Sequence, residues 1–231
     1  MFLADEYNFS STEKLDAALS EEIAKILIAA ISDRGDASLV VSGGNTPKGM
    51  LISLSKQKIP WSNVTVLLAD ERWVDASDSR SNEKMVRQYL LQNEASAASF
   101  IGFYIPNAAA MQASALLEDK LGLLDRPIDA LVLGMGEDGH TASLFPCAAN
   151  IDELLTEKEG LKTDFVKPGS APDDRITLSF STLTKARHTF LHFTGDLKKE
   201  IYQKILSGDL QVPLGRVLEA SKGNIRLYWA A

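Results

Sequence analysis

The chain has 231 residues and a formal net charge of −7. Its length suits one large domain or two small ones, and we interpret residues 1–231 as a single α/β domain. The acidic balance argues against a nucleic-acid partner, although a few local arginines can still bind an anionic small molecule. A single cysteine excludes an intrachain disulfide. Because no signal peptide and no apolar run of about 18 residues is present, we expect a cytoplasmic protein with no membrane contact. We also expect no obligatory protein partner.

Helical and strand-like patterns alternate along the chain. The opening helix has apolar residues at helical spacing and is stopped by Gly35. Helices are predicted at residues 12–32, 47–57, 82–91, 107–122, 196–207 and 214–221. Strands are predicted at residues 39–41, 64–69, 100–105, 128–133, 176–180, 189–194 and 225–229. The polar segment 150–174 contains two prolines and is predicted to be a loop.

This alternation predicts an α/β fold, with a mainly parallel sheet and helices on both faces. The strands are continuous apolar runs, as expected when both faces of a sheet are buried. Ligands of such sheets bind beyond the carboxyl ends of the strands. Three strands are each followed directly by a polar motif, at residues 42–47, 70–74 and 134–145. We therefore expect the three motifs to converge at one edge of the sheet.

The first motif, Ser42-Gly-Gly-Asn-Thr-Pro47, is typical of an anion cradle. Glycines let backbone N–H groups approach a ligand, and the N-terminus of the next helix attracts negative charge. The candidate binding residues are Ser42, Gly43, Gly44, Asn45 and Thr46. The alternative is a tight turn in which Asn45 or Thr46 caps the helix. This hexapeptide is not a Walker A motif and does not have the Gly-x-Gly-x-x-Gly pattern of a dinucleotide-binding loop, so we expect no nucleotide cofactor.

The second motif, Asp70-Glu-Arg-Trp-Val74, places charge directly after a strand. Arg72 can bind a phosphate or carboxylate through two hydrogen bonds. The alternative is a surface turn with an arginine–glutamate pair. Ser81 and Asn82 begin the next helix, where capping is the default role. Asn82 is kept as a candidate binding residue because it follows this motif closely.

The third motif, Gly134–Pro146, contains Asp138 and His140 on a glycine-rich turn, and we predict that a helix begins at Thr141. The ordinary pKa of histidine lies near physiological pH, which suits a general base. Asp138 can orient the imidazole, as the carboxylate of a catalytic triad does. The alternative for Asp138 is a turn residue that binds backbone N–H groups.

The remaining candidates are isolated polar residues. Arg175 precedes a strand and Lys198 follows one, and either can add positive charge for a phosphate. His188 and His192 lie four residues apart, or roughly 13 Å along a strand, so they cannot share one metal ion and both are interpreted as structural. Without a cluster of cysteine and histidine we expect no metal site.

The three motifs together, with Ser81-Asn82, Arg175-Ile-Thr-Leu178 and Thr194-Gly195, resemble the 6-phosphogluconolactonase family over essentially the whole chain. The resemblance implies a Rossmann-like fold shared with glucosamine-6-phosphate deaminase and ribose-5-phosphate isomerase. It also implies hydrolysis of a sugar-phosphate lactone, 6-phospho-D-glucono-1,5-lactone, in the oxidative pentose phosphate pathway, without a cofactor. By the same resemblance His140 is the general base. The loop 42–46 and Arg72 line the site, and Arg175 and Lys198 are candidate phosphate ligands.

Two other functions remain open. The deaminase resembles the chain in the glycine loop and in Asp-Gly-His, but its motif carries a catalytic glutamate where this chain has Phe145. The deaminase also has tyrosine after Asp-Glu, where this chain has Arg72-Trp73. A non-catalytic sugar-phosphate-binding module would need the glycine loop but not the pair of Asp138 and His140.

Overall fold

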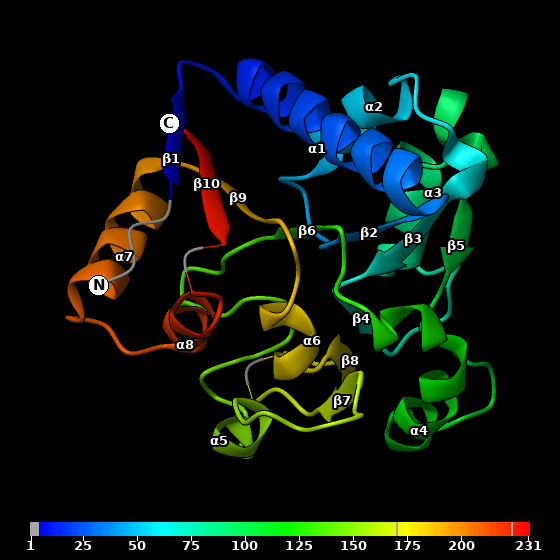
Figure 1. The fold of residues 1–231 in the computed structure, drawn as a ribbon. Coiled ribbons are helices and arrows are strands. Elements are labelled where there is room, and N and C mark those ends of the chain that lie inside the picture. Colours follow the sequence, from blue (N-terminus) through cyan, green and yellow to red (C-terminus); the bar gives the residue numbers. More distant parts are fainter. Residues whose placement is uncertain (1–4, 170, 223) are drawn as a thin grey trace.

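The computed structural model describes residues 5–169, 171–222 and 224–231. Its centre is a seven-stranded sheet in which every neighbouring pair of strands is parallel, in the order β1-β10-β9-β6-β2-β3-β5 (Figure 1). This arrangement confirms the predicted parallel α/β architecture. The strands are β1 Asp5–Phe9, β2 Ala37–Val41, β3 Val64–Leu68, β5 Ser99–Ile101, β6 Ala130–Leu133, β9 Thr189–Thr194 and β10 Ile225–Ala230.

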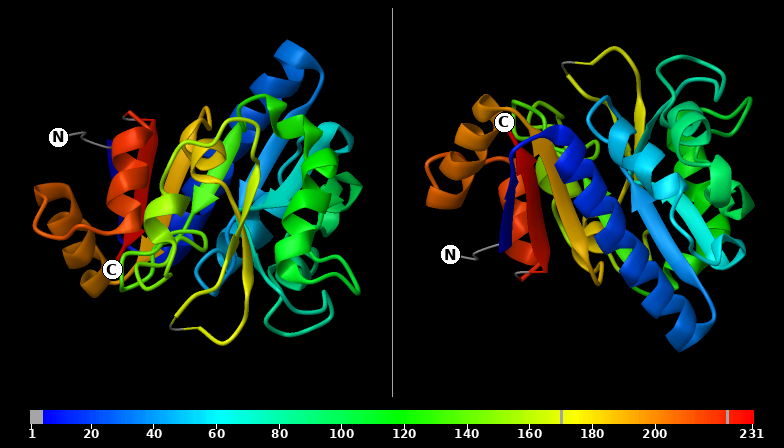
Figure 2. Two further views of the ribbon diagram at one scale, coloured as in Figure 1. Left: turned by 90° about the horizontal axis from the view of Figure 1, so that it is seen from below. Right: turned by 90° about the horizontal axis from the view of Figure 1, so that it is seen from above.

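Helices cover both faces of this sheet. The helix α1 runs diagonally across one face with α2 beside it, whereas α4 and α8 lie on the opposite face (Figure 2). The Oγ of Ser11 accepts a hydrogen bond from the backbone N–H of Lys14 at the start of α1, and left-handed Gly35 ends it. The helices are α1 Thr12–Arg34, α2 Lys48–Ser55, α3 Asn82–Tyr89, α4 Ala110–Lys120, α5 Ile151–Leu154, α6 Phe180–Thr184, α7 Asp196–Ser207 and α8 Pro213–Ala220, with 3₁₀ turns at Trp61–Asn63, Asn93–Ala97 and Gly122–Asp125.

A second, antiparallel sheet lies beside the main one, with the order β4-β8-β7 (Figure 1). Its strands are β4 Asp70–Arg72, β7 Thr163–Val166 and β8 Arg175–Leu178. The prediction of a loop over 150–174 is therefore wrong, because this segment contains α5 and β7. The strand β7 is held by pairing with β8, the next strand in the chain, and lacks a local apolar alternation, so its sequence alone does not reveal it.

Three further predictions are corrected by the structure. The strand β1 was not predicted, because its residues are mostly polar and exposed and only its pairing with β10 makes it a strand. No helix begins at Thr141, since Ala142 adopts a left-handed φ of 48° and Thr141 forms an isolated bridge with Leu144. The predicted strand 176–180 ends early because the Oγ of Ser179 caps α6.

The three polar motifs emerge from adjacent strands, β6, β2 and β3, at the middle of the main sheet. These strands are almost entirely buried and apolar. Their carboxyl ends are tied together, because the N–H of Ser42 donates to the carbonyl of Val132 and the N–H of Ala69 donates to the carbonyl of Val41. The predicted convergence of the motifs is thus confirmed. Among the described residues, no helix is both long and apolar enough to cross a membrane.

The central strand β6 generates a stability prediction. Leu131 is fully buried, so Leu131→Ala should lower the free energy of unfolding by about 2–5 kcal/mol. Leu116 on α4 is 55% exposed, and Leu116→Ala should change it by less than about 0.5 kcal/mol. Urea denaturation of both variants checks the pair. Equal losses would mean that β6 is not at the centre of the core.

Candidate active site

A cavity of about 250 Å³ opens at the carboxyl ends of β2, β3 and β6. Its volume lies near the lower end of the range for small-molecule sites, about 300–1,000 Å³. All the predicted site residues except Asp138 line it, namely Ser42, Gly43, Gly44, Asn45, Thr46, Arg72, Asn82, His140, Arg175 and Lys198. Residues from six different parts of the chain are thereby brought to one small volume.

Backbone N–H groups of the glycine loop are available to donate hydrogen bonds to a ligand. Those of Gly43, Gly44 and Thr46 donate to no acceptor within the described part of the chain. Pro47 occupies the N-cap position of α2 and no side chain caps this helix, so the alternative of an Asn45 or Thr46 cap is wrong. The loop and the uncapped helix N-terminus together form the kind of concave, positively polarised surface that binds anions.

The second motif is a buried strand rather than a surface turn. Glu71 is fully buried, and its carboxylate accepts hydrogen bonds from the N–H groups of Arg72, Asn82 and Glu83 and from the hydroxyl of Ser81. Burial raises the pKa of Glu71, and these four hydrogen bonds oppose the rise. This carboxylate joins β4 to the N-terminus of α3 and so sets the positions of Arg72 and Asn82.

The side chain of Arg72 is held in place by α3. Its Nη1 donates to the Oδ1 of Asn82 at 2.9 Å and to the carbonyl of Arg80 at 2.7 Å. The side-chain amide of Asn82 in turn donates to the carbonyl of Asp70. If residue 43 had a side chain, its β-carbon would lie 1.9 Å from the Oδ1 of Asn82. Glycine is therefore required at position 43 for the loop to approach Asn82 this closely.

Pairing of β4 with β8 places Arg72 directly beside Arg175. Arg175 is 7% exposed, and its Nε and Nη1 have no hydrogen-bond partner among the described residues. Burial and the neighbouring Arg72 lower the pKa of Arg175. The Oδ2 of Asp173 lies 3.9 Å from the Nη1 of Arg175, too far for a hydrogen bond, so the guanidinium keeps donors that an anion can fill. Lys198, in the first turn of α7, adds another cation to the same cavity.

His140 and Asp138 are in direct contact. The Nδ1 of His140 lies 2.5 Å from the Oδ1 of Asp138, which also accepts from the backbone N–H of His140 at 3.1 Å. A carboxylate at Nδ1 favours the tautomer with hydrogen on Nδ1, which leaves the Nε2 lone pair free to accept a proton. A β-carbon added at position 136 would lie 2.2 Å from the imidazole ring of His140, so only glycine fits at this position. The ring of Phe145 packs 4.4 Å from that of His140.

Two ionisable residues that line the cavity were not among the predicted site residues. Asp70 is buried and its Oδ2 accepts a hydrogen bond from Ser143 Oγ at 2.5 Å, which ties β4 to the histidine loop. His192 was interpreted as structural; it is buried as that interpretation requires, but it lies in the wall of the cavity. The signal that could have found His192 is its place near the carboxyl end of a strand, two residues before Thr194-Gly195.

The His192 ring faces α1. Its Nε2 lies 3.7 Å from the Oδ1 of Asp16, which is 8% exposed. Burial, together with the nearby Glu13, raises the pKa of Asp16 to about 6. Burial and the charge of Lys198 lower the pKa of His192 to about 4. The His192 imidazole is therefore neutral at pH 7 while Asp16 is ionised.

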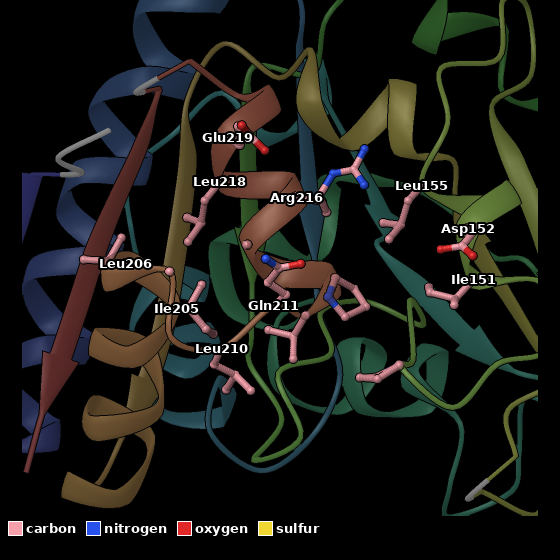
Figure 3. A pocket seen from close by; sticks show the side chains of 15 residues that line it. Ile151, Asp152, Leu155, Ile205, Leu206, Leu210, Gln211, Arg216, Leu218 and Glu219 are labelled. Carbon is pink, nitrogen blue, oxygen red and sulfur yellow. The ribbon is translucent and has the colours of Figure 1, made fainter. Parts of the chain in front are cut away.

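A larger cavity of about 760 Å³ lies between α5, α7 and α8 (Figure 3). Figure 3 shows Ile205 of α7 and Arg216 of α8 on its walls, with Asp152 and Leu155 across from them. As far as the described residues go, it contains none of the predicted site residues. Its size therefore does not make it the better candidate. Nor does any group of three or more His, Cys, Asp or Glu in the described ranges form a possible metal site.

Known proteins resemble the chain over nearly its whole length. The model of the family described as Glucosamine-6-phosphate isomerases/6-phosphogluconolactonase matches residues 10–229. A 6-phosphogluconolactonase of Rhizobium meliloti (strain 1021) is 39% identical, covering 98% of this chain and 99% of that protein. The crystal structure of a 6-phosphogluconolactonase from Shewanella baltica OS155 has a TM-score of 0.94 at 40% identity and covers 99% of this chain and 98% of that chain. A monomeric glucosamine-6-phosphate deaminase shares the fold, with a TM-score of 0.75 at 17% identity and coverage of 98% and 97%.

The raised pKa of Asp16 predicts a pH-dependent effect of Asp16→Asn. Between about pH 4 and pH 6 the folded protein holds a proton on Asp16 that the unfolded chain has lost, so stability falls as the pH rises. The variant lacks this penalty and should gain on the order of 1–3 kcal/mol over the parent at pH 7, but not at pH 3.5. Urea denaturation at both pH values measures the difference.

Asp75 is the matched control for this prediction. Its hydrogen bonds with Ser77 lower its pKa, so Asp75→Asn should give no gain at pH 7. If Asp16→Asn gained the same stability at both pH values, this would contradict the assignment of Asp16 as a carboxylate whose charged form is destabilised by burial.

Proposed function

The chain belongs to the glucosamine-6-phosphate isomerase/6-phosphogluconolactonase family, and on that basis we propose that it is an enzyme that hydrolyses 6-phospho-D-glucono-1,5-lactone to 6-phosphogluconate, a step of the oxidative pentose phosphate pathway. One observation carries the proposal. His140, whose imidazole is hydrogen-bonded to Asp138, lines the same cavity as the glycine loop and the incompletely paired Arg175. A base and an anion site in one cavity suit a substrate that carries both an ester carbonyl and a phosphate.

In the proposed mechanism His140 acts as a general base. Its Nε2 takes a proton from a water molecule as the water oxygen attacks the lactone carbonyl carbon. The tetrahedral intermediate then breaks the bond between that carbon and the ring oxygen, which takes the proton back from the imidazolium. Asp138 keeps the ring in the required tautomer and stabilises its charged form. General-base catalysis of this kind contributes about 10²–10⁴-fold to the rate.

The rest of the cavity binds and orients the substrate. The loop 42–46, Arg175 and Lys198 hold the phosphate, which fixes the ring against His140 without taking part in the chemistry. Arg72 is held rigidly by Asn82, so its guanidinium can stabilise the negative charge that develops on the carbonyl oxygen. A preorganised donor at that position stabilises the transition state more than the ground state.

Phe145 favours the lactonase over the deaminase. It is 8% exposed, packs on His140, and has Arg175 at 6.0 Å from its ring. A phenyl ring cannot transfer the protons that ring opening and amine loss require. A binding module without catalysis is also disfavoured, because the contact between Asp138 and His140 is unnecessary for binding.

Replacement of the proposed base should abolish most turnover. For His140→Ala we expect kcat to fall about 10²–10⁴-fold with little change in KM, because the imidazole acts on the water rather than on the phosphate. The assay uses freshly prepared 6-phosphogluconolactone and is corrected for spontaneous hydrolysis. Glucosamine 6-phosphate serves as a second substrate, on which we expect no turnover.

His188→Ala is the matched control, since His188 lies outside the cavity beside Arg226. It should keep parental turnover. Persistence of lactone hydrolysis within a few-fold in His140→Ala would refute the assigned role, and turnover of glucosamine 6-phosphate by the parent protein would favour the deaminase.

The buried arginine should control affinity. Arg175→Met removes the free donors, and we expect KM for the lactone to rise about 10–100-fold with a smaller change in kcat, since a charged hydrogen bond contributes about 1.5–3 kcal/mol. Arg80→Met is the comparison, because Arg80 is exposed and paired with Asp78 and Asp173 outside the cavity. An unchanged KM in Arg175→Met, or an equal rise in both variants, would exclude Arg175 as a phosphate ligand.

A further inference from the structure

Buried polar atoms without a hydrogen-bond partner are concentrated at the cavity. Within the described ranges they belong to Ser42, Arg175 and His192, which line the cavity, to Asp16 beside His192, and to Thr189 and Tyr202 elsewhere. Folded proteins leave few such groups unpaired, and those in a pocket are commonly completed by a ligand. Ser42 and Arg175 belong to the proposed anion site. His192 has no part in the mechanism above.

His192 lies in the wall of the cavity. It lies on β9, is 2% exposed, and both of its ring nitrogens lack a partner among the described residues. A neutral imidazole carries one donor and one acceptor, so each nitrogen left unpaired in the interior costs folding free energy. A leucine would fill this position without that cost, which indicates that the imidazole is kept for binding.

Asp16 determines which nitrogen carries the hydrogen. Its carboxylate lies against the first turn of α2, where the backbone of Met50 acts to lower its pKa and a Cβ on Gly49 would lie 1.9 Å from its Oδ2. It faces the Nε2 of His192 at 3.7 Å, a separation that one bridging water or a small rotation converts into hydrogen bonding. With an ionised carboxylate at Nε2, the hydrogen lies on Nε2 and the Nδ1 lone pair is an acceptor.

We propose that His192 is a substrate-binding residue whose Nδ1 accepts a hydrogen bond from a hydroxyl group of the sugar, and that Asp16 is a positioning residue that fixes the tautomer of His192. A phosphate dianion has no hydrogen to donate and is repelled by a bare nitrogen lone pair, so His192 selects the polyhydroxylated part of the ligand. The phosphate is left to Lys198 and Arg175. The inference deepens the proposed function, on which it rests only for the identity of the sugar.

Calorimetric titration with two probes at pH 7.5 tests the proposal. The probes are 6-phosphogluconate, which carries both hydroxyls and phosphate, and inorganic phosphate. For His192→Leu we expect the Kd of 6-phosphogluconate to rise about 3–10-fold, as for one lost hydrogen bond, and the Kd of phosphate to stay within twofold. Its thermal midpoint should equal or exceed that of the parent. His192→Gln, which keeps an acceptor, should retain most of the affinity.

Two further variants separate positioning from packing. Asp16→Asn should weaken 6-phosphogluconate but not phosphate, and its effect should vanish when His192 is already leucine, because the two residues act as one unit. Lys198→Met should weaken both probes. An unchanged Kd for 6-phosphogluconate in His192→Leu, or an equal weakening of both probes, overturns the proposal. If His192→Leu fails to fold, the Asp16→Asn titration decides in the same way.

The experiments distinguish a failure of the proposed lactonase function from a failure of the proposed role of His192. If the parent protein binds 6-phosphogluconate with the expected dependence on His192 but does not hydrolyse the lactone, the proposed function fails and this inference stands. If it hydrolyses the lactone and His192→Leu binds both probes as the parent does, this inference alone fails. Absence of 6-phosphogluconate binding by the parent protein overturns both.

Discussion

The site depends on parallel strand pairing at the centre of the main sheet. Hydrogen bonds from β2 to β6 and from β3 to β2 bring three chain segments to a common edge, although they are separated by many residues in sequence. Each segment leaves the sheet at that edge with different chemistry: the glycine loop, the charged strand β4 and the loop of His140. Because both faces of these strands are buried, the edge is fixed by the hydrophobic core and not by the polar residues that it presents.

Local charge at this edge opposes the charge of the whole chain. The protein has a net charge of −7, yet Arg72, Arg175 and Lys198 all line one small cavity. Burying Arg175 beside Arg72 without a full set of partners costs folding free energy. Glu71 offsets part of this cost by holding β4 to the start of α3 through three hydrogen bonds. An anion bound in the cavity would complete this arrangement, as the proposed phosphate site requires.

The sequence was sufficient where the signal was local and insufficient where it depended on distant pairing. The glycine loop and the Asp138–His140 turn are contiguous motifs, and the apolar runs before them were enough to place both at one edge. The contact of Arg72 with Arg175 requires β4 to pair with β8. A strand at 176–180 is predicted from the sequence, but its partner β4 is not, because β4 has only three residues and all of them are charged. The assignment of His192 as structural came from spacing alone, because only the packing of α1 against the sheet reveals Asp16 beside it.

The central claim is that one cavity holds the phosphate at one end and the reacting carbon at the other. A crystal structure of the protein with 6-phosphogluconate tests it most directly. We predict the phosphate against Arg175 and Lys198, and the carboxylate, which derives from the lactone carbonyl, roughly 3 Å from His140 Nε2 or joined to it by one water. Binding of the product in the cavity between α7 and α8, or with its phosphate against His140, would contradict the account.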